Sequence, residues 1–154
     1  MLRTLKRLFD ETGGVTAAPA FERRQLRLAV ATLLHESTRV DLESHAAEYA
    51  AAARALADLF GLDGAECAAL LAEARDKGGH LTSYFAQVAV IKRDFSMVQR
   101  VALIGHLWRI AYAHGQLDPY EDHFVRKIAH LLHVPNTQCM LVRGQAQQER
   151  AASG

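Results

Sequence analysis

Two triads of residues with metal-binding side chains occur at the same spacing in two parts of the chain. In each triad, the second residue follows the first by four positions and the third follows the second by three. Carboxylate and imidazole groups bind divalent ions, and a mixed nitrogen and oxygen set suits zinc, nickel, manganese or iron better than calcium, which prefers oxygen. One interpretation of the pattern is therefore a divalent metal site. The triads are Asp41, His45 and Glu48, and His114, Asp118 and Glu121.

The second triad also has the pattern of a helix start. Asp118 as the N-cap, Pro119 at the first helical position and Glu121 three residues after the cap would each satisfy or remove an unpaired backbone N–H. Gly115 suits the end of the preceding helix, and His114 beside that end would be favoured by the helix dipole. Capping alone accounts for this triad, so the metal and the structural interpretations both stay open here.

The first triad is less well explained by capping. His45 occupies the position of the cap aspartate, and histidine is a poor N-cap. His45 and Glu48 are three residues apart, so they share one face of a helix, and Asp41 lies just before the turn. The three side chains can converge at the corner between two helices. We therefore expect the first triad to favour a metal site more strongly than the second.

The elements that position the triads are expected to be helices. After Phe21, apolar residues recur at intervals of three and four, and the alternation of half-buried strands does not occur. Gly61 is typical of a helix end, Asp63 and Glu66 form a capping box that opens the next helix, and Ser96 opens a later one. The pattern predicts an all-α, single-domain helical bundle of about seven or eight helices.

The internal repeat is longer than the triads. At the same offset Leu34 pairs with Leu107, and after a slip of one residue Cys67 pairs with Cys139. We expect two copies of a helix-turn-helix-turn-helix unit, related by an approximate two-fold axis, with a bridging helix around residues 81–91. A third copy, which a stacked solenoid would need, is lacking in this sequence.

Equivalent positions of the two copies also carry opposite charges. Glu36 corresponds to Arg109, and we expect these two to pair across the axis and to fix how the halves dock. The aromatic residues Trp108, Tyr112 and Tyr120 surround the second turn, where they are interpreted as core and cap packing.

Length and composition limit both the organisation and the function. A chain of 154 residues that is 50% hydrophobic is expected to form one compact domain. We divide it into a short N-terminal helix and linker at 1–20, a helical domain at 21–146 and a flexible C-terminal tail at 147–154. The formal charge of +1 argues against nucleic acid as a partner. No motif of nucleophilic catalysis or phosphate binding occurs, so an enzyme is not expected.

The expected compartment is the cytoplasm. The two cysteines form no CxxC motif, which fits a reducing environment. The N-terminal apolar residues are interrupted by Arg3, Lys6 and Arg7, unlike the unbroken stretch of a secretory signal. The longest apolar run, residues 101–113, is too short to span a bilayer, so we expect no membrane association.

Several segments of the sequence together resemble a known family. The segments AHGQLDPYE, residues 113–121, and VDLESHAAE, residues 40–48, are similar to the duplicated A-D-G-x-x-D-x-x-E signature of the tellurite-resistance TerB family. Residues 107–134 resemble its stand-alone bacterial branch, and FGLDGAE at 60–66 resembles the end of its first repeat. The resemblance covers roughly residues 24–145.

The resemblance implies an all-helical, cytoplasmic and non-enzymatic module of stress response or metal sensing. It also implies that the signature positions bind metal, where His45 and His114 replace aspartates of the family pattern. These replacements would shift the preference toward ions that bind nitrogen. The expected partner is an unidentified protein or a second copy of the chain. The alternative is a structural or protein-interaction scaffold without metal, in which the triads only cap helices. The implied ligands are Asp41, His45, Glu48, His114, Asp118 and Glu121.

Overall fold

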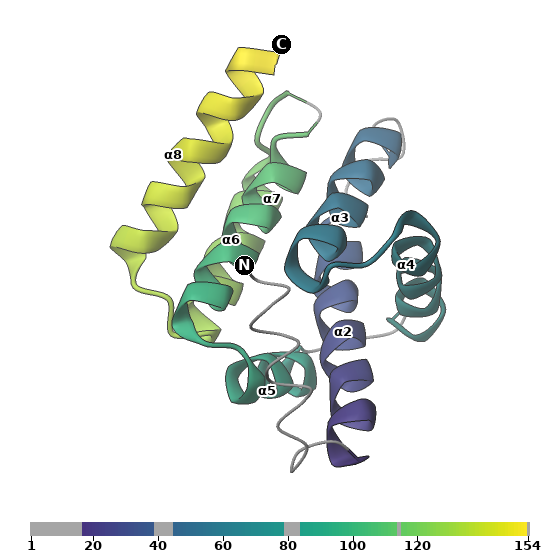
Figure 1. The fold of residues 1–154 in the computed structure, drawn as a ribbon. Coiled ribbons are helices and arrows are strands. Elements are labelled where there is room, and N and C mark those ends of the chain that lie inside the picture. Colours follow the sequence, from purple (N-terminus) through teal and green to yellow (C-terminus); the bar gives the residue numbers. More distant parts are fainter. Residues whose placement is uncertain (1–16, 39–44, 79–83, 114, 154) are drawn as a thin grey trace.

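Helices make up almost all of the part of the chain that the computed structural model describes, residues 17–38, 45–78, 84–113 and 115–153. Those residues form no strand, and the all-α prediction is confirmed. The helices run back and forth along one main direction, except for the short helix that joins the two halves (Figure 1). They are α2 (Ala17–Ser37), α3 (His45–Phe60), α4 (Gly64–Gly78), α5 (Phe85–Asp94), α6 (Met97–Ala111), α7 (Pro119–Leu131) and α8 (Asn136–Ser153).

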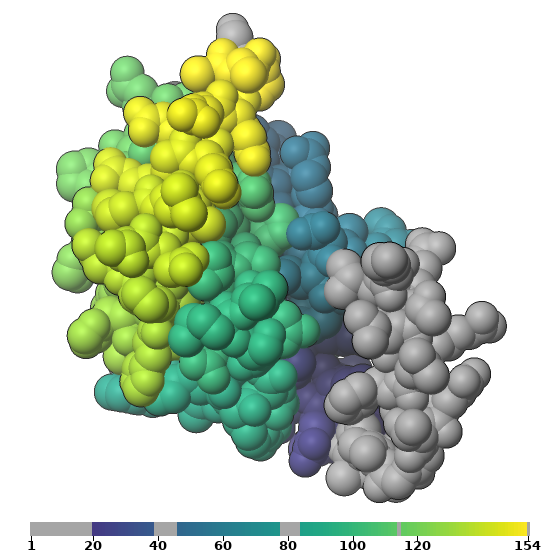
Figure 2. Space-filling model, turned by 60° about the vertical axis from the view of Figure 1, so that its left-hand side comes forward, coloured from purple at the N-terminus to yellow at the C-terminus, as the bar shows by residue number. Residues whose placement is uncertain are grey.

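The predicted duplication is visible in the way these helices pack. In the first repeat α2 contacts α3 and α4, and in the second repeat α6 contacts α7 and α8 in the same order. The halves meet mainly where α3 packs against α6, while the bridging helix α5 packs against α2 (Figure 1). In the space-filling view, α8 forms a ridge along one side of the molecule (Figure 2). The connection by α5 therefore brings two similar three-helix units face to face.

Matching turns end the second helix of each repeat. Gly61 follows α3 with φ +68°, and His133 follows α7 with φ +59°. The left-handed backbone suits glycine and strains other residues. Each turn is followed by a buried apolar residue, Leu62 in the first repeat and Val134 in the second. The two turns are 72 positions apart, which is the offset after the one-residue slip found in the sequence.

The core is centred on α6, and Trp108 joins that helix to α8. Trp108 is fully buried, and its indole N–H donates a hydrogen bond of 3.2 Å to the carbonyl oxygen of Cys139. The guanidinium carbon of Arg143 lies 5.4 Å from the centre of the indole ring. One side chain thus contributes apolar burial, a hydrogen bond and a cation–π contact to a single helix pair.

Each repeat has one buried thiol at an equivalent position. Cys67 lies in α4 and Cys139 in α8, and both are free cysteines. Their backbone N–H groups donate to Asp63 and Pro135, each at 3.0 Å, so both sit in the first turn of their helix. Burial raises the pKa of both thiols. They are core residues in a reduced state.

Both ends of the helical region differ from the expected boundaries. Helix α2 begins at Ala17, and it accommodates Pro19 because proline is tolerated in a first turn. Helix α8 continues through residues 147–153, where we expected a tail. The expected N-terminal helix and most of its linker, residues 1–16, lie outside the described residues. Within the described part, no helix is both long enough and apolar enough to cross a membrane.

Candidate functional site

Three of the candidate ligands can be placed in the structure. Glu48 lies in the first turn of α3, Asp118 is the N-cap of α7, and Glu121 lies in the first turn of α7. Glu48 and Glu121 therefore occupy the same position in the two repeats. The other candidates fall outside the described part of the structure: Asp41, His114 and the side chain of His45.

The two equivalent glutamates are buried. Glu48 is 0% exposed and Glu121 is 3% exposed, whereas Glu66, at the corresponding position of α4, is exposed. A glutamate that only completes a capping box can remain in solvent, as Glu66 does. Burial of a carboxylate is costly unless hydrogen bonds, a cation or a metal ion offset the lost hydration. Both corners therefore direct their last triad carboxylate into the protein.

The N-cap of α7 agrees with the structural interpretation of Asp118. Its Oδ1 accepts a hydrogen bond of 2.7 Å from the Tyr120 N–H, and Pro119 fills the first helical position. The two reciprocal bonds of a capping box are formed at Ser96 and Gln99 of α6, but Asp118 caps through Tyr120. The cap uses one carboxylate oxygen of Asp118 and leaves Oδ2 for solvent or a ligand.

The two triad-bearing corners lie at the same end of the bundle. Figure 1 shows the ends of α2 and α6 and the starts of α3 and α7 together there. A narrow crevice at this end, with no room for a water molecule, is lined by Glu36 and Ser37 of α2, Ala111 of α6, and Tyr120 and Glu121 of α7. The buried glutamate of the second repeat thus faces the end of the first helix of the other repeat.

Only part of each triad belongs to the described residues. Within those residues, no group of three or more His, Cys, Asp or Glu side chains has the arrangement of a metal site. The triads depend on Asp41, His45 and His114, whose side chains lie outside that part of the structure. The metal site therefore stays a prediction.

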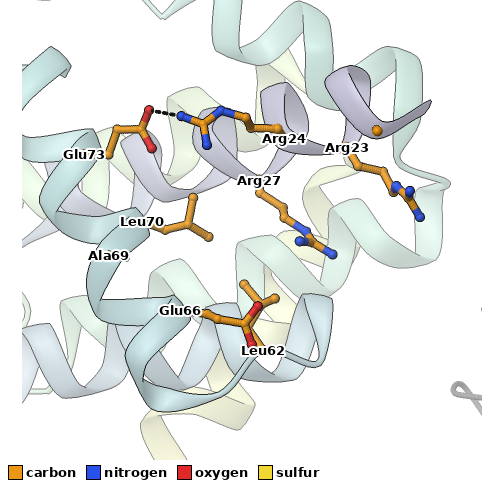
Figure 3. A pocket seen from close by; sticks show the side chains of 9 residues that line it. Arg23, Arg24, Arg27, Leu62, Glu66, Ala69, Leu70 and Glu73 are labelled. Carbon is orange, nitrogen blue, oxygen red and sulfur yellow. Dashed lines mark hydrogen bonds and ion pairs between the residues drawn. The ribbon is translucent and has the colours of Figure 1, made fainter. Parts of the chain in front are cut away.

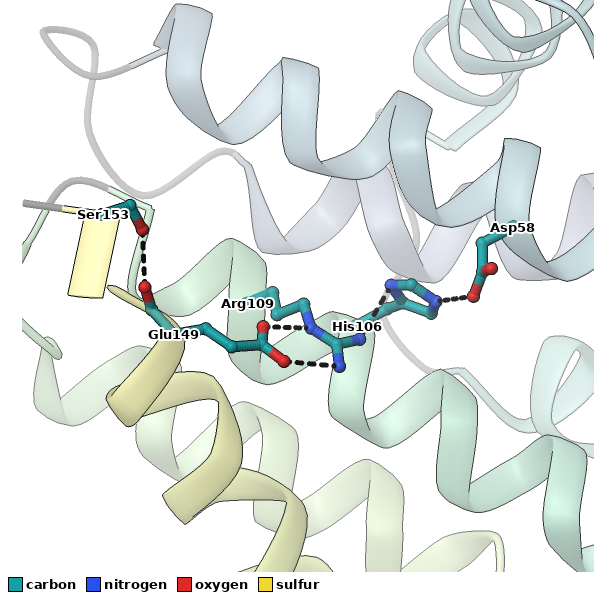
Figure 4. A network of polar contacts seen from close by, with 5 residues as sticks. All are labelled: Asp58, His106, Arg109, Glu149 and Ser153. Atoms are coloured by element: carbon teal, nitrogen blue, oxygen red, sulfur yellow. Dashed lines mark hydrogen bonds and ion pairs between the residues drawn. The ribbon is translucent and has the colours of Figure 1, made fainter. Parts of the chain in front are cut away.

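A chain of polar contacts, which the sequence did not reveal, connects three helices (Figure 4). The Nε2 of His106 lies 2.8 Å from Oδ2 of Asp58, and its Nδ1 lies 3.3 Å from Nη1 of Arg109. Arg109 also donates to Glu149 at 2.8 Å. The expected pair of Glu36 with Arg109 is therefore wrong, because the carboxylate that binds Arg109 comes from α8.

The geometry fixes the protonation of His106. A guanidinium group can only donate, so Nδ1 of His106 accepts from Arg109 and the ring proton lies on Nε2, facing Asp58. Burial lowers the pKa of His106, and the hydrogen bond that His106 donates to Asp58 acts in the opposite direction and raises the pKa. The equivalent residue of the first repeat is Leu33, which is fully buried. The sequence signal for this network was that His106 replaces a core leucine at the equivalent position of the repeat.

Comparison with known proteins gives one match that covers most of the chain. The family model described as Tellurite resistance protein TerB matches residues 27–144. The match includes both triads and runs from the middle of α2 into α8. Searches of curated proteins and of solved structures gave no match.

Proposed function

Because this chain belongs to the tellurite-resistance TerB family, we propose that it is a non-enzymatic, cytoplasmic module of stress response or metal sensing. In this proposal it binds a divalent metal ion at the paired corners between its helices. The main support is the burial of Glu48 and Glu121, at 0% and 3% exposure, in equivalent positions of the two repeats. Two buried carboxylates at duplicated corners exceed what helix capping requires.

The donor set fits a metal ion in its chemistry. Glu48 and Glu121 would each contribute a carboxylate from a position that excludes water, and Asp118 would contribute the oxygen that its cap leaves available. Histidines 45 and 114, with Asp41, would complete the set from the connecting segments. Such a set favours zinc, nickel, manganese or iron over calcium. A bound ion would add positive charge beside the two buried glutamates.

The position of the corners suggests how binding would be sensed. Residues of both repeats line the crevice beside Glu121, so an ion bound by the Glu121 carboxylate would stabilise the packing of one half on the other. An ion that binds the native state and not the unfolded chain raises stability by mass action. Occupancy would then control how readily the end of the bundle opens.

The alternative is a scaffold without metal, in which the corners only cap helices. The hydrogen bond of 2.7 Å from the Tyr120 N–H to Asp118, together with Pro119, supports it. Function would then lie in contacts with an unidentified protein or a second copy of the chain.

Thermal melting with added ions separates these two functions. Protein purified without a nickel column and treated with chelator would be melted with zinc, nickel, manganese or calcium. At a free ion concentration of 100 times Kd, binding adds about 2.7 kcal/mol, which corresponds to roughly 5–10 °C in Tm for a domain of this size. We expect that shift for at least one of the first three ions and a smaller one for calcium.

Matched variants locate the site. Glu48→Gln and Glu121→Gln should each abolish most of the shift in Tm, because the amide keeps the size of the side chain but removes its charge. Glu66→Gln is the control, since it changes an exposed glutamate at the same helix position and glutamine also serves in a capping box. If no ion shifts the melt of the wild-type protein, the metal proposal is wrong and the scaffold is favoured.

A further inference from the structure

A groove between the first half of α2 and α4 gathers cationic side chains (Figure 3). The groove has a volume of about 590 Å³, and Arg23, Arg24 and Arg27 of α2 line it. Leu62 and Leu70 contribute apolar surface. We call it the α2–α4 groove. It lies outside the triads, and neither function considered above assigns a role to it.

The carboxylates of the groove are already engaged. Glu73 accepts hydrogen bonds from Arg24 at 2.7 Å and from Lys77 at 2.9 Å. Glu66 accepts from the Asp63 N–H at 3.3 Å and forms the capping box of α4. These two carboxylates are the only acidic side chains that line the groove in the described part of the chain. The groove thus contains three arginines and two glutamates, and both glutamates already accept hydrogen bonds from residues of the protein.

Arg27 differs from Arg24 in having no carboxylate partner among the residues that the structure describes. Its guanidinium carbon lies 5.8 Å from the centre of the Phe60 ring, and the residue is half-buried. Among the described residues, no carboxylate or carbonyl oxygen accepts a hydrogen bond from Arg27. Figure 3 shows the group extending from α2 toward the side of the groove that holds Glu66 and Leu62. A guanidinium stacked on an aromatic ring keeps its N–H edge for a carboxylate or phosphate.

In the second repeat, the arginine equivalent to Arg27 has a structural role. Arg100 is the equivalent of Arg27, and it donates hydrogen bonds to the backbone carbonyl oxygens of Lys92, Phe95 and Leu132, at 2.7, 3.1 and 3.2 Å. Those bonds satisfy the guanidinium group within the fold. Within the part of the chain that the structure describes, the guanidinium of Arg27 makes no such bond, and its N–H groups can donate to a ligand.

The other two arginines of the groove, Arg23 and Arg24, also occur only in the first repeat. At the same offset, Arg23 corresponds to Ser96 and Arg24 to Met97. The second repeat therefore forms the same pair of packed helices with neutral residues at these two positions. Arg24 joins α2 to α4 through Glu73, a contact that the second repeat does without.

We propose that the α2–α4 groove binds an acidic peptide segment of a partner protein. Arg27 pairs with a carboxylate of the peptide, Arg23 adds electrostatic attraction, and Leu70 contacts a neighbouring apolar side chain. The groove extends along α4 from Glu66 to Glu73, a length of about 10 Å at 1.5 Å per residue. About three residues of an extended peptide span this length. The presence of these two acids disfavours a uniform polyanion such as nucleic acid.

The test uses the ¹⁵N-labelled full chain, in buffer with chelator, and the peptide acetyl-Ala-Glu-Glu-Leu-Glu-Ala-amide. We expect saturable shifts of the amide resonances at residues 20–27 and 62–73, and an affinity that falls with added salt. The same peptide with glutamine in place of each glutamate should cause no such shifts. Arg27→Gln should weaken binding at least tenfold. Arg75→Gln, which removes an exposed arginine of α4 outside the groove, should leave it unchanged.

Several results would overturn the proposal. These are equal shifts with the glutamine peptide, shifts centred outside the groove, and undiminished binding by Arg27→Gln. Equal affinity for sodium phosphate would also overturn it, because that result indicates a general anion site. If the dispersion of the spectrum shows that Arg27→Gln is misfolded, Arg23→Gln replaces it, and we expect severalfold weaker binding from that exposed position.

Discussion

Replacing His106 by leucine tests what the polar network between α3, α6 and α8 contributes. Leucine is the residue at the equivalent position of the first repeat, Leu33, so the substitution makes the two repeats alike there. At pH 7.5 we expect the free energy of unfolding to change by less than about 1 kcal/mol. At acidic pH we expect the variant to become the more stable protein.

The small effect at pH 7.5 follows from two opposing contributions. The variant loses the hydrogen bonds of His106 to Asp58 and Arg109, worth about 0.5–1.5 kcal/mol each. Asp58 is 67% exposed at its side chain and regains water, and Arg109 keeps Glu149. A buried leucine contributes about 1.5–3 kcal/mol, part of which the imidazole ring already provides. The two contributions nearly cancel.

The pH dependence follows from the lowered pKa of His106. Burial is the main cause and the neighbouring Arg109 adds to it, while Asp58 and Glu149 act in the opposite direction. The folded protein therefore takes up this proton less readily than the unfolded chain, whose histidine has a pKa of about 6.5. The stability is complete above that value and falls as the pH drops through it toward the folded pKa. One such group changes stability by at most about 1.4 kcal/mol per pH unit.

Urea denaturation followed by the fluorescence of the single tryptophan would measure both effects at pH 7.5, 6.5 and 5.5. The difference between wild type and His106→Leu isolates this histidine, because the other histidines are common to both proteins. His123→Gln, at an exposed position, is the control. The reasoning is refuted if wild type and variant lose stability in parallel as the pH falls. A loss above about 2 kcal/mol at pH 7.5 would show that the hydrogen bonds outweigh the apolar gain.

The remaining predictions concern stability. Gly61→Ala should cost about 1 kcal/mol and His133→Gly should gain about as much, because both backbones are left-handed. Apart from its chain neighbours, no described residue has an atom within 4 Å of a Cβ placed at Gly61, so the cost is conformational. Urea midpoints measure both, and effects of equal sign would contradict the explanation. Trp108→Phe should cost about 2 kcal/mol by loss of the hydrogen bond to Cys139 and of ring volume, lowering Tm by roughly 4–8 °C. An unchanged Tm would show that Trp108 does not join α6 to α8.

Local chemistry explains which parts of the structure the sequence could predict. The caps at Ser96 and Asp118 and the turn at Gly61 depend on residues within a few positions of one another. Apolar periodicity depends only on one helix, and the duplication made each helix visible twice. The helices, their order and the bridging helix were therefore predictable. The left-handed turn at His133 was predictable only through its repeat partner, because histidine does not mark such a turn.

Contacts between distant helices were not predictable in the same way. The partner of Arg109 is Glu149, 40 positions away, and the sequence favoured Glu36 because the repeat placed the two charges in equivalent positions. Equivalence in a repeat does not imply contact. The burial of Glu48 and Glu121 likewise depends on how the halves dock. The spacing of the triads predicts the ligand types but contains no information about depth in the protein.

The two buried cysteines can be used to measure local opening of the protein. Cys67 and Cys139 lie at equivalent positions of separate repeats, and each is shielded from solvent. A thiol reagent can modify such a side chain only when the helix around it opens, so the rate of modification measures the opening free energy of that repeat. Single-cysteine variants would then report on each half separately. Equal rates would mean that the two halves open as one cooperative unit, and unequal rates would identify the half that opens first.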